Sequence, residues 1–77
     1  MNFNLLMKCA TEIVSNLKNV KNVTIDDGHR IDNEPYMIVY FHKKNEKNLD
    51  EPRKAKRYKY SEEQKKFIFD TERYSYI

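Results

Sequence analysis

The sequence predicts a small α+β domain in which an N-terminal helix packs on one face of an antiparallel sheet of three or four strands. Three observations support this fold class. Residues 3 to 18 repeat apolar side chains at the helical period. Four later segments alternate, or carry the β-branched and aromatic residues typical of strands. The chain has 77 residues, which is the size of a single domain with a thin core.

The helix is predicted over residues 3 to 18 because its apolar side chains form one stripe. Asn2 is the candidate N-cap, and Asn19 can end the helix in a left-handed turn. Leu5 lies off the stripe, and Cys9 lies at its edge, where we expect it to be a small, partly buried packing residue. A one-sided stripe predicts that the helix covers a sheet. The stripe consists of Phe3, Leu6, Met7, Ala10, Ile13, Val14 and Leu17.

Two strands are predicted in the first half of the chain. In residues 20 to 26, Val23 and Ile25 alternate with polar side chains. Residues 36 to 42 are the most apolar run, and their aromatic and β-branched content favours a central strand. The segment between them contains Asp-Gly, which predicts a turn because glycine tolerates a positive φ.

Residues 43 to 52 are charged, contain Asn and Pro and show no period, so we expect a mobile surface loop. Residues 53 to 60 then alternate, and neither of their two faces is strongly apolar. This pattern predicts an exposed or edge strand whose lysines oppose edge-to-edge pairing. One face carries Ala55, Arg57 and Lys59, and the other carries Lys56, Tyr58 and Tyr60.

The last seventeen residues admit two interpretations. Ser61-Glu62-Glu63-Gln64 matches a helix capping box, which favours a C-terminal helix. Phe67-Ile68-Phe69 and the tyrosines near the end favour a strand. We favour a hairpin with Glu62 and Glu63 at its tip, in which residues 65 to about 77 return along the preceding strand.

Several classes of function are disfavoured by what the sequence lacks. One glycine excludes a phosphate-cradling loop and a dinucleotide fingerprint. One cysteine excludes an intrachain disulfide, and with two scattered histidines it makes no zinc site. The segment with Asp26, Asp27, His29 and Asp32 matches no calcium loop, so turn chemistry explains it better than a metal does. We expect no enzyme, no cofactor and no metal.

Location and origin follow from composition alone. No apolar run approaches the roughly 20 residues of a membrane span, and the N-terminus does not resemble a signal peptide. We therefore expect a cytoplasmic protein with no membrane partner. The abundant Lys, Asn, Tyr and Ile have A/T-rich codons, which suggests a low-GC bacterium or one of its phages or mobile elements.

Positive charge is confined to the middle of the chain. The net charge is +3, and residues 43 to 66 hold ten Lys or Arg against five Asp or Glu. Within this region, residues 53 to 60 interleave cations with tyrosines, and a similar pattern returns at residues 73 to 76. Such surfaces suit nucleic acid or an acidic protein. The candidate binding residues are Lys54, Lys56, Arg57, Tyr58, Lys59, Tyr60, Arg73, Tyr74 and Tyr76.

The six tyrosines exceed what one short helix can cover, so some must face water or another chain. We expect a non-enzymatic accessory, regulator or inhibitor that binds a larger host or cellular protein. The alternative is a nucleic-acid binder that uses the 53–60 strand. The thin core also makes a homodimer a candidate. Tyr58 and Tyr60 exposed beside several cations would favour nucleic acid, whereas tyrosines apart from the cations would favour a protein.

Overall fold

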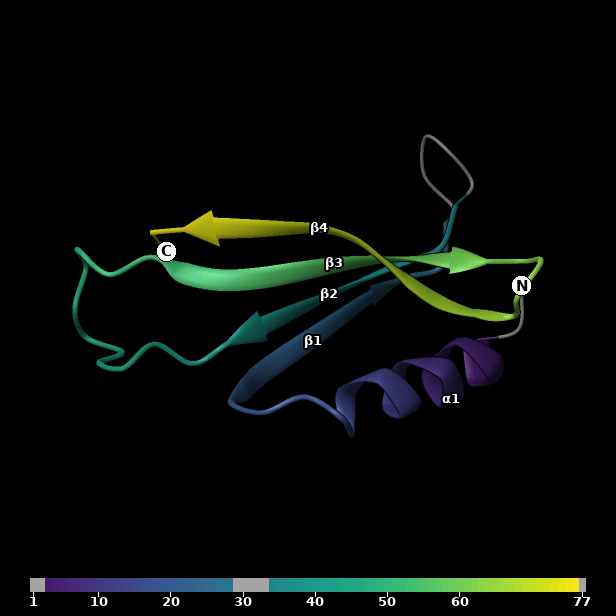
Figure 1. Ribbon diagram of the computed structural model, residues 1–77, viewed down its shortest axis with the longest axis horizontal. Coiled ribbons are helices and arrows are strands. Elements are labelled where there is room, and N and C mark those ends of the chain that lie inside the picture. Colours follow the sequence, from purple (N-terminus) through teal and green to yellow (C-terminus); the bar gives the residue numbers. More distant parts are fainter. Residues whose placement is uncertain (1–2, 29–33, 77) are drawn as a thin grey trace.

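The computed structural model shows one helix packed on a four-stranded antiparallel sheet (Figure 1). It describes residues 3–28 and 34–76. The strands follow one another across the sheet in the order β1-β2-β3-β4, so every neighbouring pair is joined by one connection. The predicted α+β fold is confirmed, with four strands. The elements are α1 (Phe3–Val14), β1 (Val20–Asp26), β2 (Tyr36–Phe41), β3 (Arg53–Ser61) and β4 (Lys66–Ser75).

Helix α1 ends at Val14, earlier than the predicted residue 18. Ser15 Oγ and Asn16 Nδ2 both donate to the Glu12 carbonyl, at 3.0 Å each, and so compete with the helical bonds. The backbone amides of Asn16 and Leu17 donate to the carbonyls three residues earlier, which tightens the last turn. Asn19 then adopts the predicted left-handed conformation, with φ 63°. The predicted N-cap, Asn2, lies outside the described residues.

Strand β2 supplies the centre of the core, as its apolar sequence predicts. Met37 and Val39 are fully buried, and Phe41 is nearly so. Met37 pairs with Ile25 of β1 on one side and with Tyr58 of β3 on the other. These alternate residues face α1, whose own buried residues include Leu6, Cys9 and Ala10. The Cys9 thiol donates to the Lys65 carbonyl at 3.5 Å, which is consistent with the packing role expected of it.

The prediction that residues 53 to 60 could form an edge strand is wrong. Strand β3 lies between β2 and β4, and the edge strands are β1 and β4. An interior strand tolerates these charges because α1 covers only part of one sheet face. Lys54 and Lys56 lie over the ring of Phe41, from which their ammonium groups reach water. The predicted division of the strand into two faces is confirmed by its register with β2.

The C-terminal segment forms the predicted hairpin and not the alternative helix. Ser61 still behaves as a cap, because its hydroxyl accepts from the Gln64 amide at 3.1 Å, but it caps a turn. Lys65 closes that turn with φ 53°, and β4 returns antiparallel to β3.

In the described part of the chain, no helix is both long and apolar enough to cross a membrane.

Candidate functional site

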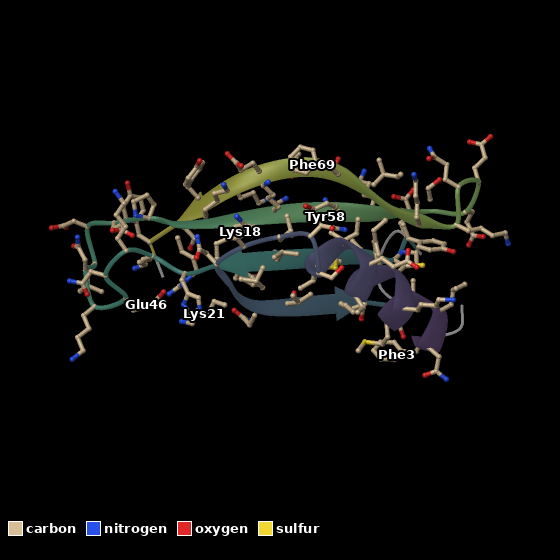
Figure 2. The ribbon with its side chains drawn as sticks, turned by 60° about the horizontal axis from the view of Figure 1, so that its bottom comes forward. Phe3, Lys18, Lys21, Glu46, Tyr58 and Phe69 are labelled. Carbon is tan, nitrogen blue, oxygen red and sulfur yellow. The ribbon has the colours of Figure 1, made fainter. Side chains whose placement is uncertain are left out.

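The two faces of the sheet differ in what covers them. Helix α1 lies across one face, near β1 and the start of β4, as both views show (Figures 1 and 2). Among the described residues, none forms a layer over the opposite face, which we call the open face. Register and strand alternation assign to it Tyr36, Ile38, Tyr40, Ala55, Arg57, Lys59, Ile68, Thr71 and Arg73.

The centre of the open face is apolar and aromatic. Tyr36, Ile38 and Tyr40 project from β2 and are half-buried among their neighbours. A shallow hollow of about 600 Å³ runs across the four strands of this face. Its lining includes Asn22, Thr24, Ile38, Tyr40, Ala55 and Arg73. A surface of this kind can accept a protruding side chain of a partner while its rim makes polar contacts.

Cations surround this aromatic centre. The Arg57 guanidinium lies 4.7 Å from the centroid of the Tyr36 ring, in stacking range. Arg57 also forms an ion pair of 3.6 Å with Asp70, which sits at the bulge where the β3–β4 register shifts. Lys59 and Arg73 are exposed on the same face. The rim is therefore positive, while Arg57 is partly neutralised by the chain's own carboxylate.

A second group of cations lies on the helix face, near the end of α1. The Nζ atoms of Lys54 and Lys56 lie 5.2 and 5.8 Å from the centroid of the Phe41 ring. Together with Lys18 and His42 they line a hollow of about 320 Å³, which we call the lysine hollow. Figure 2 shows Lys18 extending over the sheet here. Lys54 Nζ also lies 3.8 Å from Glu72 Oε1, and this ion pair offsets part of the positive charge at the lysine hollow.

The two tyrosines of the basic block belong to the core. Tyr58 is 6% exposed, and burial raises the pKa of its hydroxyl. Its ring meets Phe69 edge-to-face at 5.8 Å, and Tyr60 meets Phe67 in the same way at 5.6 Å. Tyr60 is half-buried, and burial, the largest cause, raises its pKa. Tyr58 therefore offers no free face for stacking on a base, and the packing of Tyr60 against Phe67 restricts its ring.

The tyrosines near the C-terminus are the exposed ones. Tyr74 is 60% exposed and Tyr76 is 65% exposed, as the predicted surplus of tyrosines requires. The Tyr74 hydroxyl donates to Glu72 Oε2 at 2.9 Å, and this bond raises the pKa of Tyr74. Tyr74 also contributes to the rim of the hollow on the open face.

The structure thus divides the sequence-predicted site residues between surfaces. Arg57, Lys59 and Arg73 meet on the open face, whereas Lys54, Lys56, Tyr58 and Tyr60 belong to the helix face. The sequence-based selection omitted the centre of the open face, which consists of Tyr36, Ile38 and Tyr40. The sequence did contain a signal for this centre. Its three side chains alternate along β2 with Met37, Val39 and Phe41, which are buried on the other face.

The charged loop is organised around Glu46. Its carboxylate accepts hydrogen bonds from the Arg53 guanidinium and, at 2.8 Å, from the Lys43 amide. These two bonds, in that order, hold the pKa of Glu46 well below its usual range. Arg53 also donates to the Phe41 carbonyl at 2.9 Å, so this cation of the basic block has a structural role. The mobility expected of residues 43 to 52 stays a prediction.

The acidic turn after β1 follows ordinary turn chemistry. Asp26 Oδ1 accepts from the Gly28 amide at 2.8 Å, and Gly28 adopts φ 83°. His29 and Asp32, which completed the sequence-derived metal hypothesis, lie outside the described residues. Within residues 3–28 and 34–76, no three His, Cys, Asp or Glu side chains are grouped so that they could hold a metal ion.

Comparison with known proteins supplies no relative: the chain matches no protein-family model, no curated protein and no solved structure. Function must therefore be inferred from the chain's own surfaces.

Proposed function

We propose that this protein is a non-catalytic binding module, an accessory, regulator or inhibitor that docks on a larger protein through the open face. The observation that supports the proposal is the composition of that face. Three large side chains of β2 lie at its centre with no layer above them among the described residues, and cations stand at its rim. Aromatic residues and arginine in such an arrangement dominate protein-binding hot spots.

The placement of the cations favours a protein partner over nucleic acid. Nucleic-acid grooves line up unneutralised cations and free aromatic faces along one track. Here the cations of β3 alternate between two faces, and Arg53, Lys54 and Arg57 each form an ion pair with a carboxylate of the chain itself. The two tyrosines between them pack in the core.

The chemistry of the open face defines the partner. Its surface should present an apolar or aromatic protrusion that fits against Ile38 and Tyr40, since these line the hollow. Acidic side chains should flank the protrusion, where they meet Lys59 and Arg73. Because these rim charges are exposed, they should mainly raise the association rate and make that rate depend on salt. Their effect on the affinity should be smaller.

The test is capture of a partner from a nuclease-treated lysate of the organism that encodes the chain. The wild type, Tyr40→Ala and a control, Leu49→Ser, are immobilised in parallel. Leu49 is 76% exposed in the loop, away from the open face, so its loss should change nothing. The proposal expects one stoichiometric protein on the wild type and the control, at least about tenfold depleted on Tyr40→Ala. Recovery of no stoichiometric protein, or equal recovery on all three, contradicts it.

A second candidate, nucleic-acid binding, is favoured by the lysine hollow alone. Lys18, Lys54 and Lys56 converge there beside an aromatic ring, and no acidic residue lines the hollow. A gel shift at low salt with duplex and single-stranded DNA and RNA tests it. This candidate expects a complex that weakens steeply with salt and is lost in the Lys54→Ala/Lys56→Ala variant. Absence of a shift at low salt excludes it.

A further inference from the structure

The two edges of the sheet differ in their capacity to pair with another copy of the chain. An edge strand offers unpaired backbone groups, and proteins commonly protect such edges with charges and bulges. Strand β4 has both protections, since its register shifts at Asp70 and its middle carries Asp70, Glu72 and Arg73. Self-pairing centred on Thr71 would oppose Asp70 to Glu72, and pairing centred on Glu72 would oppose two glutamates. Strand β4 is therefore protected by its bulge and by the like charges that these registers oppose.

Strand β1 has neither protection over most of its length. Its pairing with β2 is regular from Asn22 to Asp26, because the irregularity lies at its start, between Val20 and Asn22. The four residues Asn22, Val23, Thr24 and Ile25 carry no charge. An uncharged, regular edge of this length can serve as a template for an additional strand.

An apolar groove runs along the same edge, between α1 and β1. It has a volume of about 480 Å³, and no charged residue lines it. Phe3 and Met7 form its outer wall on α1, and they are 51% and 45% exposed although the sequence pattern predicts them within the buried stripe. Figure 2 shows Phe3 on the β1 side of the helix. Apolar side chains of the helix therefore lie beside a strand edge whose backbone groups can pair with another strand.

Charge identifies the strand that fits this edge. The start of β1 is basic, with Lys18 and Lys21, and its end is acidic, with Asp26 and Asp27. A second β1 in antiparallel orientation brings the basic start of each copy beside the acidic end of the other. In the register centred on Val23, Val23 faces Val23 and Asn22 faces Thr24, so no like charges meet between residues 22 and 24. A parallel orientation would oppose like charges at both ends.

We propose that a second copy of this chain docks on β1, which yields a symmetric dimer with one continuous eight-stranded sheet. In this arrangement the two α1 helices lie on the same side of the sheet, and Phe3 and Met7 of each copy close the groove of the other. The dimer supplies the additional burial that a 77-residue chain with a thin core lacks. The dimer leaves the open face free. The proposal of a dimer can therefore fail without contradicting the proposed function, and the reverse also holds.

Light scattering after size exclusion tests the dimer. At about 100 µM, which exceeds a micromolar Kd, the wild type should show twice the chain mass of 9.4 kDa. Met7→Glu should weaken association at least about tenfold, because it places a charge in the closed groove. The control is Leu5→Glu, since Leu5 is also an exposed helix residue but does not line the groove. A monomeric wild type at about 100 µM, or a Kd that a dilution series shows to be unchanged in Met7→Glu, overturns the proposal. Circular dichroism must show both variants folded.

Crosslinking tests the register, and it does so without disturbing the groove. In a Cys9→Ala background, Asn22→Cys and Thr24→Cys chains are mixed and oxidised. Residue 22 of one copy faces residue 24 of the other, so a mixed disulfide should form faster than a disulfide in either variant alone. A disulfide that forms no faster in the mixture contradicts the antiparallel β1 pairing.

Discussion

The one-sided cover of the sheet can be tested by placing the same charge on each of its faces. Met37 and Ile38 are adjacent in β2, so a glutamate at either position changes strand propensity to a similar extent. Met37 is fully buried against α1, whereas Ile38 lies half-buried on the open face. Met37→Glu and Ile38→Glu should therefore differ widely in their free energies of unfolding.

The expected costs follow from burial. Removing the Met37 side chain from the core loses about 2 kcal/mol of transfer free energy. A carboxylate there binds a proton, with a pKa raised by up to about 4 units, and protonating it at neutral pH adds about 4 kcal/mol. The sum is comparable with the whole stability of such a domain, about 4–12 kcal/mol. Ile38→Glu loses about 2 kcal/mol of apolar contact, and the facing Arg57 returns up to about 1 kcal/mol.

Thermal unfolding followed by circular dichroism distinguishes the variants. At about 4–8 °C per kcal/mol, Ile38→Glu should melt roughly 5–15 °C below the wild type, and Met37→Glu should be unfolded or melt at least about 30 °C lower. An unfolded Ile38→Glu would mean that another layer or another copy covers the open face. A stable Met37→Glu would mean that α1 does not cover the opposite face. Either result refutes the placement of the binding surface.

Three further predictions concern the loop, the turn and the C-terminal strand. Since the folded-state pKa of Glu46 is lowered, its stabilising effect is complete above its ordinary value of 4.5 and is lost progressively below it. The stability deficit of Glu46→Gln in urea should therefore shrink as the pH falls below 4.5, and a constant deficit contradicts this. Gly28→Ala should lower the free energy of unfolding by at least about 1 kcal/mol, because φ is positive there; an unchanged urea midpoint contradicts it. Glu72→Gln should lower the pKa of Tyr74 in an ultraviolet titration, since the bond to the carboxylate raises it; an unchanged titration contradicts the bond.

The sequence predicted local features well where a short-range pattern determines them. The bounds of β1 match residues 20 to 26, and the β3–β4 hairpin forms as the strand-forming residues 67 to 69 indicate. The left-handed residue Asn19 was also predicted, because asparagine tolerates that conformation better than most residues.

The position of a strand within the sheet could not be predicted from its own residues. Strand β3 looks like an edge because it is rich in Lys and Arg, yet those cations contact Phe41, Glu46 and Asp70, which lie outside the strand. The same holds for the candidate site. Tyr58 and Tyr60 resemble stacking residues in the sequence, and only the β4 phenylalanines packed against them show that they belong to the core.

The open face as the binding surface can be tested most directly by methyl NMR of the chain with its captured partner. Ile38 and Val39 are adjacent in sequence and project from opposite faces of β2, so their methyl groups report on the two faces separately. The proposal predicts a large shift or broadening of the Ile38 methyl signals on binding, with the Val39 methyl signals little changed. Perturbation of Val39 alone, or of neither residue, would contradict it.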